Sequence, residues 1–191
     1  AGDEGIITES PWLRLKVGAA AQSRDRILEP DEWTSLWVAA KAIPYPFGPF
    51  TCTLMLSAQR LSTVAQMRWD ELHGDVWVIP KEKIKAPRPK DAKAHEVPLS
   101  RALADTIAAL PSISPYVIST TGDKPISPGS KLKLRLQRDS GTSDWRWHDL
   151  RRTGATLMAK RKVPRFIVER VLGHSDTSVT AIYDRSTYRD E

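Results

Sequence analysis

The sequence has few of the residues that build disulfides and metal sites. Its 191 residues include one cysteine, Cys52, and four histidines, with no HExxH motif and no paired CxxC motif. A single thiol excludes a disulfide within the chain and a thiolate metal site. Cys52 lies in an apolar run, so we expect it to be a small buried side chain. We predict no metal site.

The motifs of nucleotide-binding sites and of serine hydrolases are also absent. The sequence contains no GxxxxGK[ST], no GxGxxG and no GxSxG, which removes the usual phosphate cradles and the nucleophile elbow. We therefore predict no cofactor. Catalysis by this chain must use arginine, lysine, histidine and tyrosine side chains.

Long apolar runs are missing, and the excess of positive charge is modest. No run approaches the roughly 18 residues of a membrane span, and residues 1–12 have no basic region followed by an apolar core. We expect no membrane contact and a reducing compartment, the cytoplasm. The net charge of +6 and the pI near 9.5 favour a polyanionic partner such as nucleic acid, although plain solvated surfaces often carry a similar excess.

Hydrophobic periodicity predicts helices in the first and last thirds of the chain. Residues 1–26 show no sustained period and are typical of a linker, whereas a helix is expected from Pro30 to near Pro44. YPFGPF should break the chain before two short helices or one bent helix, with Arg60 at the bend. Later helices are expected at about 130–138, 148–161, 164–172 and 178–184.

The middle of the chain changes to the period of a sheet. DVWVIP and HEVPLS read as strands joined by a loop rich in lysine and proline, and Ser100 is a good N-cap for a helix ending before Pro111. A turn-rich loop, TGDKPISPGS, follows. We predict a mostly α-helical fold with a small antiparallel β-sheet, an α+β domain of ordinary size.

One short motif, WHDLRRT, combines residue types that suit phosphate chemistry. His148 and Arg151 are three positions apart, so a helix places both on one face. The guanidinium offers a planar fork to two phosphate oxygens, and the imidazole can move a proton near neutral pH. An incidental pair on a surface helix would have the same spacing, so the motif alone leaves both interpretations open.

Further motifs occur in an informative order along the chain. Arg60 comes first, then Lys85 in the basic loop, HDLR at 148–151, LGH at 172–174 and Tyr183 in VTAIYDR. This order, with the flanks Arg68-Trp69, WVIP and VPLS, resembles the catalytic domain of the tyrosine recombinase (phage integrase) family. The resemblance runs from about residue 27 to 191 and implies that family's fold.

The resemblance also implies a role for each of these residues. Arg60 and Arg151 would clamp the scissile phosphate and stabilise its transition state. Lys85 would protonate the leaving 5′ oxygen, and His148 would accept the tyrosine proton or orient the phosphate. His174 would donate a further hydrogen bond, and Tyr183 would be the nucleophile.

The implied activity is that of a site-specific DNA recombinase. Such an enzyme cleaves and rejoins DNA through a covalent 3′-phosphotyrosine intermediate and integrates or excises a mobile element, without metal or ATP. Two alternatives stay open: a relaxing enzyme of the type IB topoisomerase kind, and a DNA-binding module that has lost catalysis. The implied partners are double-stranded DNA attachment sites, a homotetramer on DNA that is a monomer off DNA, and accessory DNA-bending proteins.

The resemblance extends to domain organisation and location. It predicts residues 1–26 to be a linker from an upstream core-binding domain and residues 27–191 to be the catalytic domain, in a protein encoded by a bacterium or phage and associated with the nucleoid. The expected DNA contacts are basic side chains in two groups: Lys81, Lys83, Lys85, Arg88, Lys90 and Lys93 in the loop, and Lys131, Lys133, Arg135, Arg138 and Arg146 further on.

Three positions need separate comment. Three residues after its first arginine the family usually has an acidic residue, and this chain has Thr63, which carries no charge to support Arg60. His95 opens the HEVPLS strand and can be read as a phosphate contact or as a structural histidine. Tyr188, five residues after Tyr183, is expected to be a packing residue.

Overall fold

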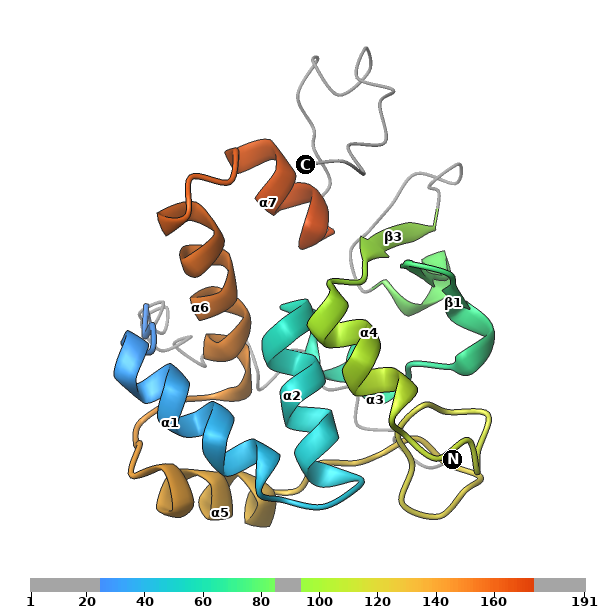
Figure 1. Cartoon of the computed structure of the whole chain (residues 1–191), viewed down its shortest axis with the longest axis horizontal. Helices are drawn as coiled ribbons and strands as arrows, with labels where there is room; N and C mark the ends of the chain where they lie inside the picture. Colours follow the sequence, from blue (N-terminus) through green and yellow to red (C-terminus); the bar gives the residue numbers. More distant parts are fainter. Residues whose placement is uncertain (1–24, 85–93, 174–191) are drawn as a thin grey trace, which may run out of the picture.

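The computed structural model describes residues 25–84 and 94–173. Within these ranges the helices surround one side of a small sheet (Figure 1). The α-helices are α1 (Pro30–Lys41), α2 (Phe47–Ser57), α3 (Leu61–Ala65), α4 (Arg101–Ala108), α5 (Ser130–Ser140), α6 (Trp147–Lys160) and α7 (Arg165–Val171). The strands are β1 (Leu72–His73), β2 (Val76–Ile79) and β3 (His95–Pro98), and the single 3-10 turns are η2 (Trp69–Glu71) and η3 (Lys81–Lys83).

Helix α2 is the centre of the helical part. It packs against α1, α3, α4 and α6, and eight of its 11 residues are buried, as its almost continuous apolar sequence requires. Cys52 is among them, and burial raises the pKa of its thiol to about 11. The prediction of a small buried cysteine is confirmed.

The expected break at YPFGPF is wrong in its second half, because α2 begins at Phe47. Pro49 occupies the third helical position, where the missing N–H has no intrahelical partner to lose. Gly48 allows the turn before it to close: a Cβ at this position would lie 1.8 Å from the Ile43 carbonyl oxygen. The proline therefore belongs to the first turn of a helix.

The predicted pair of strands is confirmed. β2 pairs antiparallel with β3, with Ile79 opposite His95, and β1 adds a third strand on the other edge. Trp77 and Val97 are buried cross-strand partners. The sequence did not indicate β1, because two residues are too few to show a period of two.

The remaining helices agree with the sequence to within a few residues. Ser100 caps α4, accepting a hydrogen bond from the Leu103 amide at 3.3 Å. α5, α6 and α7 match the helices expected at 130–138, 148–161 and 164–172. The helix expected at 178–184 lies outside the described residues. None of the described helices is long and apolar enough to cross a membrane.

Two apolar clusters hold the helices together. The larger one contains the buried side chains of α1, α2 and the sheet, with Trp77 and Trp145 among its largest members. The smaller one joins Ala58, just after α2, to Val168 and Leu172 of the α7 region. It fixes the C-terminal end of α7 beside α2 and α6, as the approach of α7 to the centre of Figure 1 shows.

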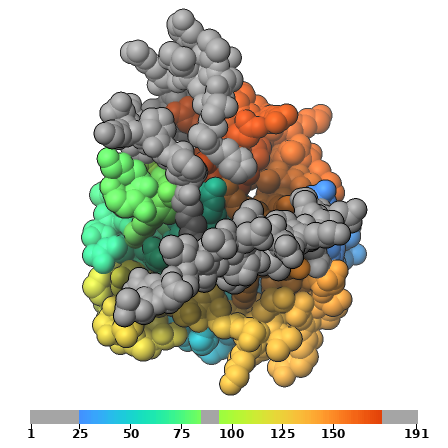
Figure 2. All heavy atoms as spheres, turned by 180° about the vertical axis from the view of Figure 1, so that it is seen from behind, coloured from blue at the N-terminus to red at the C-terminus, as the bar shows by residue number. Residues whose placement is uncertain are grey.

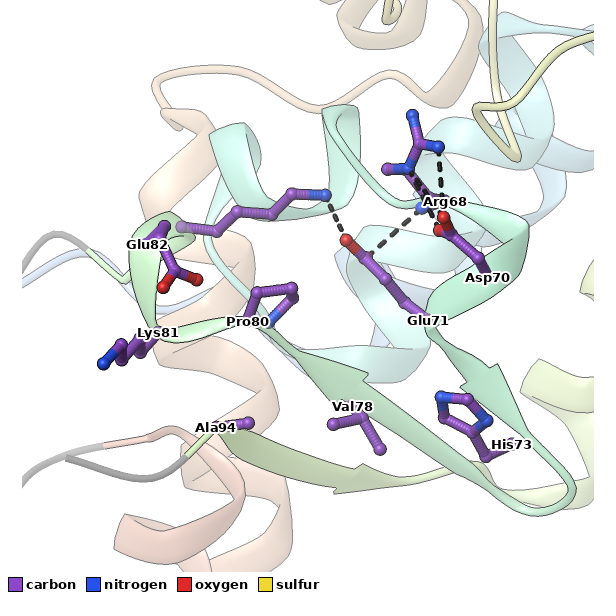
Figure 3. A pocket seen from close by; sticks show the side chains of 10 residues that line it. Arg68, Asp70, Glu71, His73, Val78, Pro80, Lys81, Glu82 and Ala94 are labelled. Carbon is purple, nitrogen blue, oxygen red and sulfur yellow. Dashed lines mark hydrogen bonds and ion pairs between the residues drawn. The ribbon is translucent and has the colours of Figure 1, made fainter. Parts of the chain in front are cut away.

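A buried carboxylate ties the sheet to the segment before it. Glu71 is 5% exposed and accepts hydrogen bonds from Trp77 Nε1 at 3.1 Å and from the Arg68 amide at 3.2 Å, and it forms an ion pair with Lys83. Lys83 also donates to the Gln66 carbonyl at 2.6 Å. In Figure 3 a dashed line joins Glu71, at the end of η2, to Arg68. One side chain thus connects three donors from separate positions in the chain.

We expect Glu71→Ala to destabilise the fold. The change leaves the indole N–H of Trp77 buried without an acceptor and Lys83 without its counter-ion, a loss of about 3 kcal/mol in the free energy of unfolding. The urea midpoint measures it. Asp70→Ala is the matched control, because the exposed Asp70 pairs only with Arg68 at the surface. An unchanged midpoint in Glu71→Ala contradicts the assignment.

Candidate functional site

His148 and Arg151 open onto one hollow on the side of α6. It has a volume of about 380 Å³, and its wall also includes Arg152, Asp25 and Leu172. The expectation that the two HDLR side chains share a helix face is therefore confirmed. Asp149 caps the helix by accepting a hydrogen bond from the Arg146 amide at 2.8 Å, which fixes the first turn that carries His148.

Arg151 is the most constrained charge in this hollow. It is 4% exposed, and its two terminal nitrogens donate to the Ala58 carbonyl at 2.9 Å and to the Leu172 carbonyl at 2.6 Å. These acceptors lie at the C-terminal ends of α2 and α7. The guanidinium thus joins three helices at one point, and its orientation is set by the backbone.

Arg60 lies two residues beyond one of these acceptors, at the N-cap of α3. Ala58 between the helices takes a left-handed conformation with φ 51°, which turns the chain sharply after α2. The side chain of Arg60 is half-buried and has no carboxylate partner in the described part of the chain. Thr63 is buried in α3 and adds no charge.

The two guanidinium groups act on each other electrostatically. The pKa of Arg151 is lowered to about 10, first by burial and then by the positive charge of Arg60. A buried cation with a second cation in range is unfavourable in the free protein. An anion between them would remove that repulsion.

His148 responds to the same positive field. Its pKa is lowered from 6.5, chiefly by partial burial, then by Arg151 and Arg152, while Asp149 opposes the shift and Arg60 adds a smaller contribution. The imidazole is therefore neutral at pH 7 and carries a free lone pair. This state allows it to accept a proton.

Arg152 and Asp25 are site residues that the sequence reasoning missed. They form an ion pair at 3.6 Å on the wall of the hollow. The position of Arg152, four residues after His148, was a usable signal, because that spacing shares a helix face. Asp25 had no such signal. It is held beside α6 because the Leu28 amide donates to Thr153 Oγ1 at 3.0 Å, a contact between residues 125 apart.

Half of the predicted catalytic set lies beyond the described ranges. Lys85, His174 and Tyr183, and the proposed DNA contacts Arg88, Lys90 and Lys93, are outside the described residues. The glycine of the LGH motif is described: Gly173 closes α7 with φ 64°, as its place in the motif predicts.

The other basic residues expected at DNA are spread over the surface. Lys81 is exposed beside the sheet, whereas the Lys83 ammonium is held by Glu71. On α5, Arg135 and Arg138 pair with Asp139, and Lys131 and Lys133 lie on the same helix. α5 is at the opposite end of the molecule from α7 (Figures 1 and 2). Arg146 is exposed just before α6.

A larger hollow, of about 570 Å³, lies beside the sheet and holds none of the predicted catalytic side chains that are described. Its charged wall is largely paired, Asp70 with Arg68 and Glu71 with Lys83 (Figure 3). The described residues contain no group of three or more metal-ligating side chains. The smaller hollow on α6 is therefore the candidate site.

Comparison with known proteins finds a matching family model over most of the chain. The sequence model of the phage integrase family matches residues 26–190. The integrase of Escherichia phage HK022 is 25% identical over 195 residues, covering 98% of this chain and 54% of that protein. The chain thus spans about half the length of this relative.

Solved structures show the same fold. The lambda integrase catalytic core has a TM-score of 0.61 and 22% identity, over 80% of this chain and 96% of that one. A lambda integrase tetramer bound to a Holliday junction has a TM-score of 0.63 and 20% identity, over 84% of this chain and 50% of that one. The mostly helical α+β fold expected from the sequence is confirmed.

The His148 titration tests the electrostatics of the hollow. We expect Arg152→Gln to raise the His148 pKa toward 6.5, because one of the charges that lowers it is removed. Nuclear magnetic resonance of the imidazole Cε1–H between pH 5 and 8 measures it. Arg138→Gln on α5 removes an equal charge away from the hollow and should leave the titration unchanged. Equal shifts in both variants would mean that only net charge matters.

Proposed function

This chain belongs to the phage integrase family, and from that premise we propose that it is the catalytic part of a site-specific DNA recombinase. It cleaves one DNA strand with a tyrosine, holds the 3′ end as a phosphotyrosine, and rejoins it to a new 5′ hydroxyl in integration or excision of a mobile element. The observation that carries the proposal is the presence of His148 and Arg151 at one hollow, together with the positive charge of Arg60, which acts on both of them.

The scissile phosphate binds between Arg60 and Arg151 in this proposal. Burial and then the charge of Arg60 lower the Arg151 pKa, and the negative charge of the phosphate offsets the repulsion between the two cations. Since Arg151 is already anchored on two backbone carbonyls, it needs little rearrangement when charge builds on the phosphate oxygens. Preorganised donors of this kind stabilise a transition state more than a ground state.

The chemical step is balanced by proton transfers at both ends of the phosphate. Tyr183 Oη forms a bond to phosphorus as the bond to the 5′ oxygen breaks. The phenol proton passes to the neutral imidazole of His148, and Lys85 supplies a proton to the departing 5′ oxygen. His174 donates a hydrogen bond to the phosphate. The phosphotyrosine keeps the energy of the broken phosphodiester, so rejoining uses neither ATP nor a metal.

The proposed partners are those of a recombinase acting on duplex DNA. One lambda integrase that shares this fold is a tetramer bound to a Holliday junction, which supports a homotetramer on attachment-site DNA, with monomers off DNA and accessory DNA-bending proteins as further partners. Because the substrate is bacterial or phage DNA, we propose a cytoplasmic, nucleoid-associated location. The division into a linker at 1–26 and a catalytic domain at 27–191 stays a prediction.

The first test asks which tyrosine attacks DNA. We expect the wild-type chain to form a covalent adduct with a nicked suicide duplex on denaturing electrophoresis, and Tyr183→Phe to form none, because only the hydroxyl is removed. Tyr116→Phe is the matched control, since Tyr116 stacks on Arg68 away from the hollow. Tight DNA binding without an adduct in the wild type would favour a module that has lost catalysis. Relaxation of supercoiled plasmid without paired sites would favour the topoisomerase alternative.

The second test separates the arginine clamp from ordinary surface charge. Arg60→Lys keeps the charge and loses the planar fork, so cleavage at saturating DNA should fall by roughly a hundredfold or more while DNA affinity changes little. Single-turnover adduct formation and a binding titration measure the two quantities. Arg138→Lys on α5 should leave cleavage unchanged. Parallel losses of affinity and cleavage in Arg60→Lys would make Arg60 a simple DNA contact.

A further inference from the structure

The C-terminal end of α7 is held by side chains from three other parts of the chain. The last carbonyls of a helix have no intrahelical donor and need partners from elsewhere. Here Val171 O accepts from Gln59 Nε2 at 2.7 Å, and Leu172 O accepts from Arg151 at 2.6 Å. Gln59 directly precedes Arg60, so two of these donors belong to the arginine clamp and its immediate neighbour.

The third donor is His95, the first residue of β3. Its Nε2 lies 3.1 Å from Val171 O. A backbone carbonyl can only accept, so this nitrogen carries the proton in the contact and the ring acts as a donor. The sequence left His95 open as either a phosphate contact or a structural histidine, and this geometry commits Nε2 to the backbone.

The contact also shapes the chain immediately before the LGH histidine. The imidazole lies against Gly173, where a Cβ would be 2.9 Å from His95 Nε2, and Gly173 has φ 64°. A side chain at residue 173 would displace the ring, and a smaller residue at 95 would leave the turn without its packing partner. The position of the Gly173 turn therefore depends on His95.

Unlike Gln59 and Arg151, His95 lies next to the basic loop in the sequence. It begins β3 directly after the segment that contains Lys85 and is opposite Ile79 of β2. α7 and β3 are in contact. The side chain thus links the strand that receives the loop to the helix end that precedes residue 174.

We infer that His95 is a positioning residue: by holding the end of α7 against the start of β3, it keeps the Leu172 carbonyl in place as an acceptor that orients Arg151. This inference rests on the proposed function. In this assignment His95 takes no part in the bond-making and bond-breaking steps. It acts by aligning groups on two elements that are 76 residues apart in the chain, where a displacement of about 1 Å can lower a rate a hundredfold.

The experiment compares His95→Leu with His95→Gln in single-turnover cleavage of the nicked suicide duplex. Leucine has a similar bulk and no donor, whereas glutamine restores an N–H at a similar reach. We expect His95→Leu to lower the rate of adduct formation at saturating DNA at least tenfold with the dissociation constant within twofold, and His95→Gln to recover most of that rate. His73→Leu, on the exposed edge strand of the same sheet, should match the wild type.

The outcomes separate the inference from the proposed function. A wild-type rate in His95→Leu overturns the inference, and so does a loss of affinity with a shallower salt dependence, which would mark a phosphate contact. Equal rate losses in His95→Leu and His95→Gln, with a lower urea midpoint in both, would reduce His95 to a stability role. Absence of an adduct in the wild type overturns the proposed function itself. Long-range 1H–15N spectra of the free protein then test the geometry alone, which requires the Nε2–H tautomer.

Discussion

The bridge that Arg151 makes between two helix ends is the constraint on which the candidate site depends. A buried guanidinium is tolerated only where strong acceptors replace its water. The acceptors here are the carbonyls of Ala58 and Leu172, at the ends of α2 and α7. The small cluster of Ala58, Val168 and Leu172 packs at the same place. The apolar cluster and the hydrogen bonds that replace water around Arg151 therefore require the same arrangement of α2, α6 and α7. Arg60 lies two residues after Ala58 in the chain.

The same arrangement concentrates positive charge where the described residues offer little to neutralise it. Burial and then Arg60 lower the pKa of Arg151, and partial burial, then Arg151 and Arg152 and last Arg60, lower that of His148. Like charges held close reduce the stability of the free protein, and functional sites commonly retain such strain. The fixed cations give the hollow an affinity for anions before any ligand arrives. Arg152 pairs with Asp25, whose carboxylate is exposed to solvent.

Much of the fold and part of the candidate site could be predicted from the sequence, because their signals were local. The helix that carries His148 and Arg151, the cap at Ser100 and the paired strands each follow from residues within one or two turns of each other. The long-range contacts that assemble the site could not be predicted from local patterns. Three hydrogen bonds connect residues that are 76 to 125 positions apart: Gln59 with Val171, His95 with Val171, and Leu28 with Thr153. No local sequence pattern predicts such partners. The start of α2 was missed because its proline falls in the one turn of a helix that tolerates it.

The contacts of Glu71 also restrict where the chain can place Lys85, the residue to which the family resemblance assigns the role of general acid. Glu71 and the Gln66 carbonyl fix Lys83 to the body of the domain, and Lys85 is only two residues further along. Two peptide units span at most about 7 Å, whatever their conformation. Chain geometry alone therefore keeps the α-carbon of residue 85 within about 7 Å of that of Lys83. The point from which the chain continues to residue 85 is thus fixed by the buried carboxylate of Glu71.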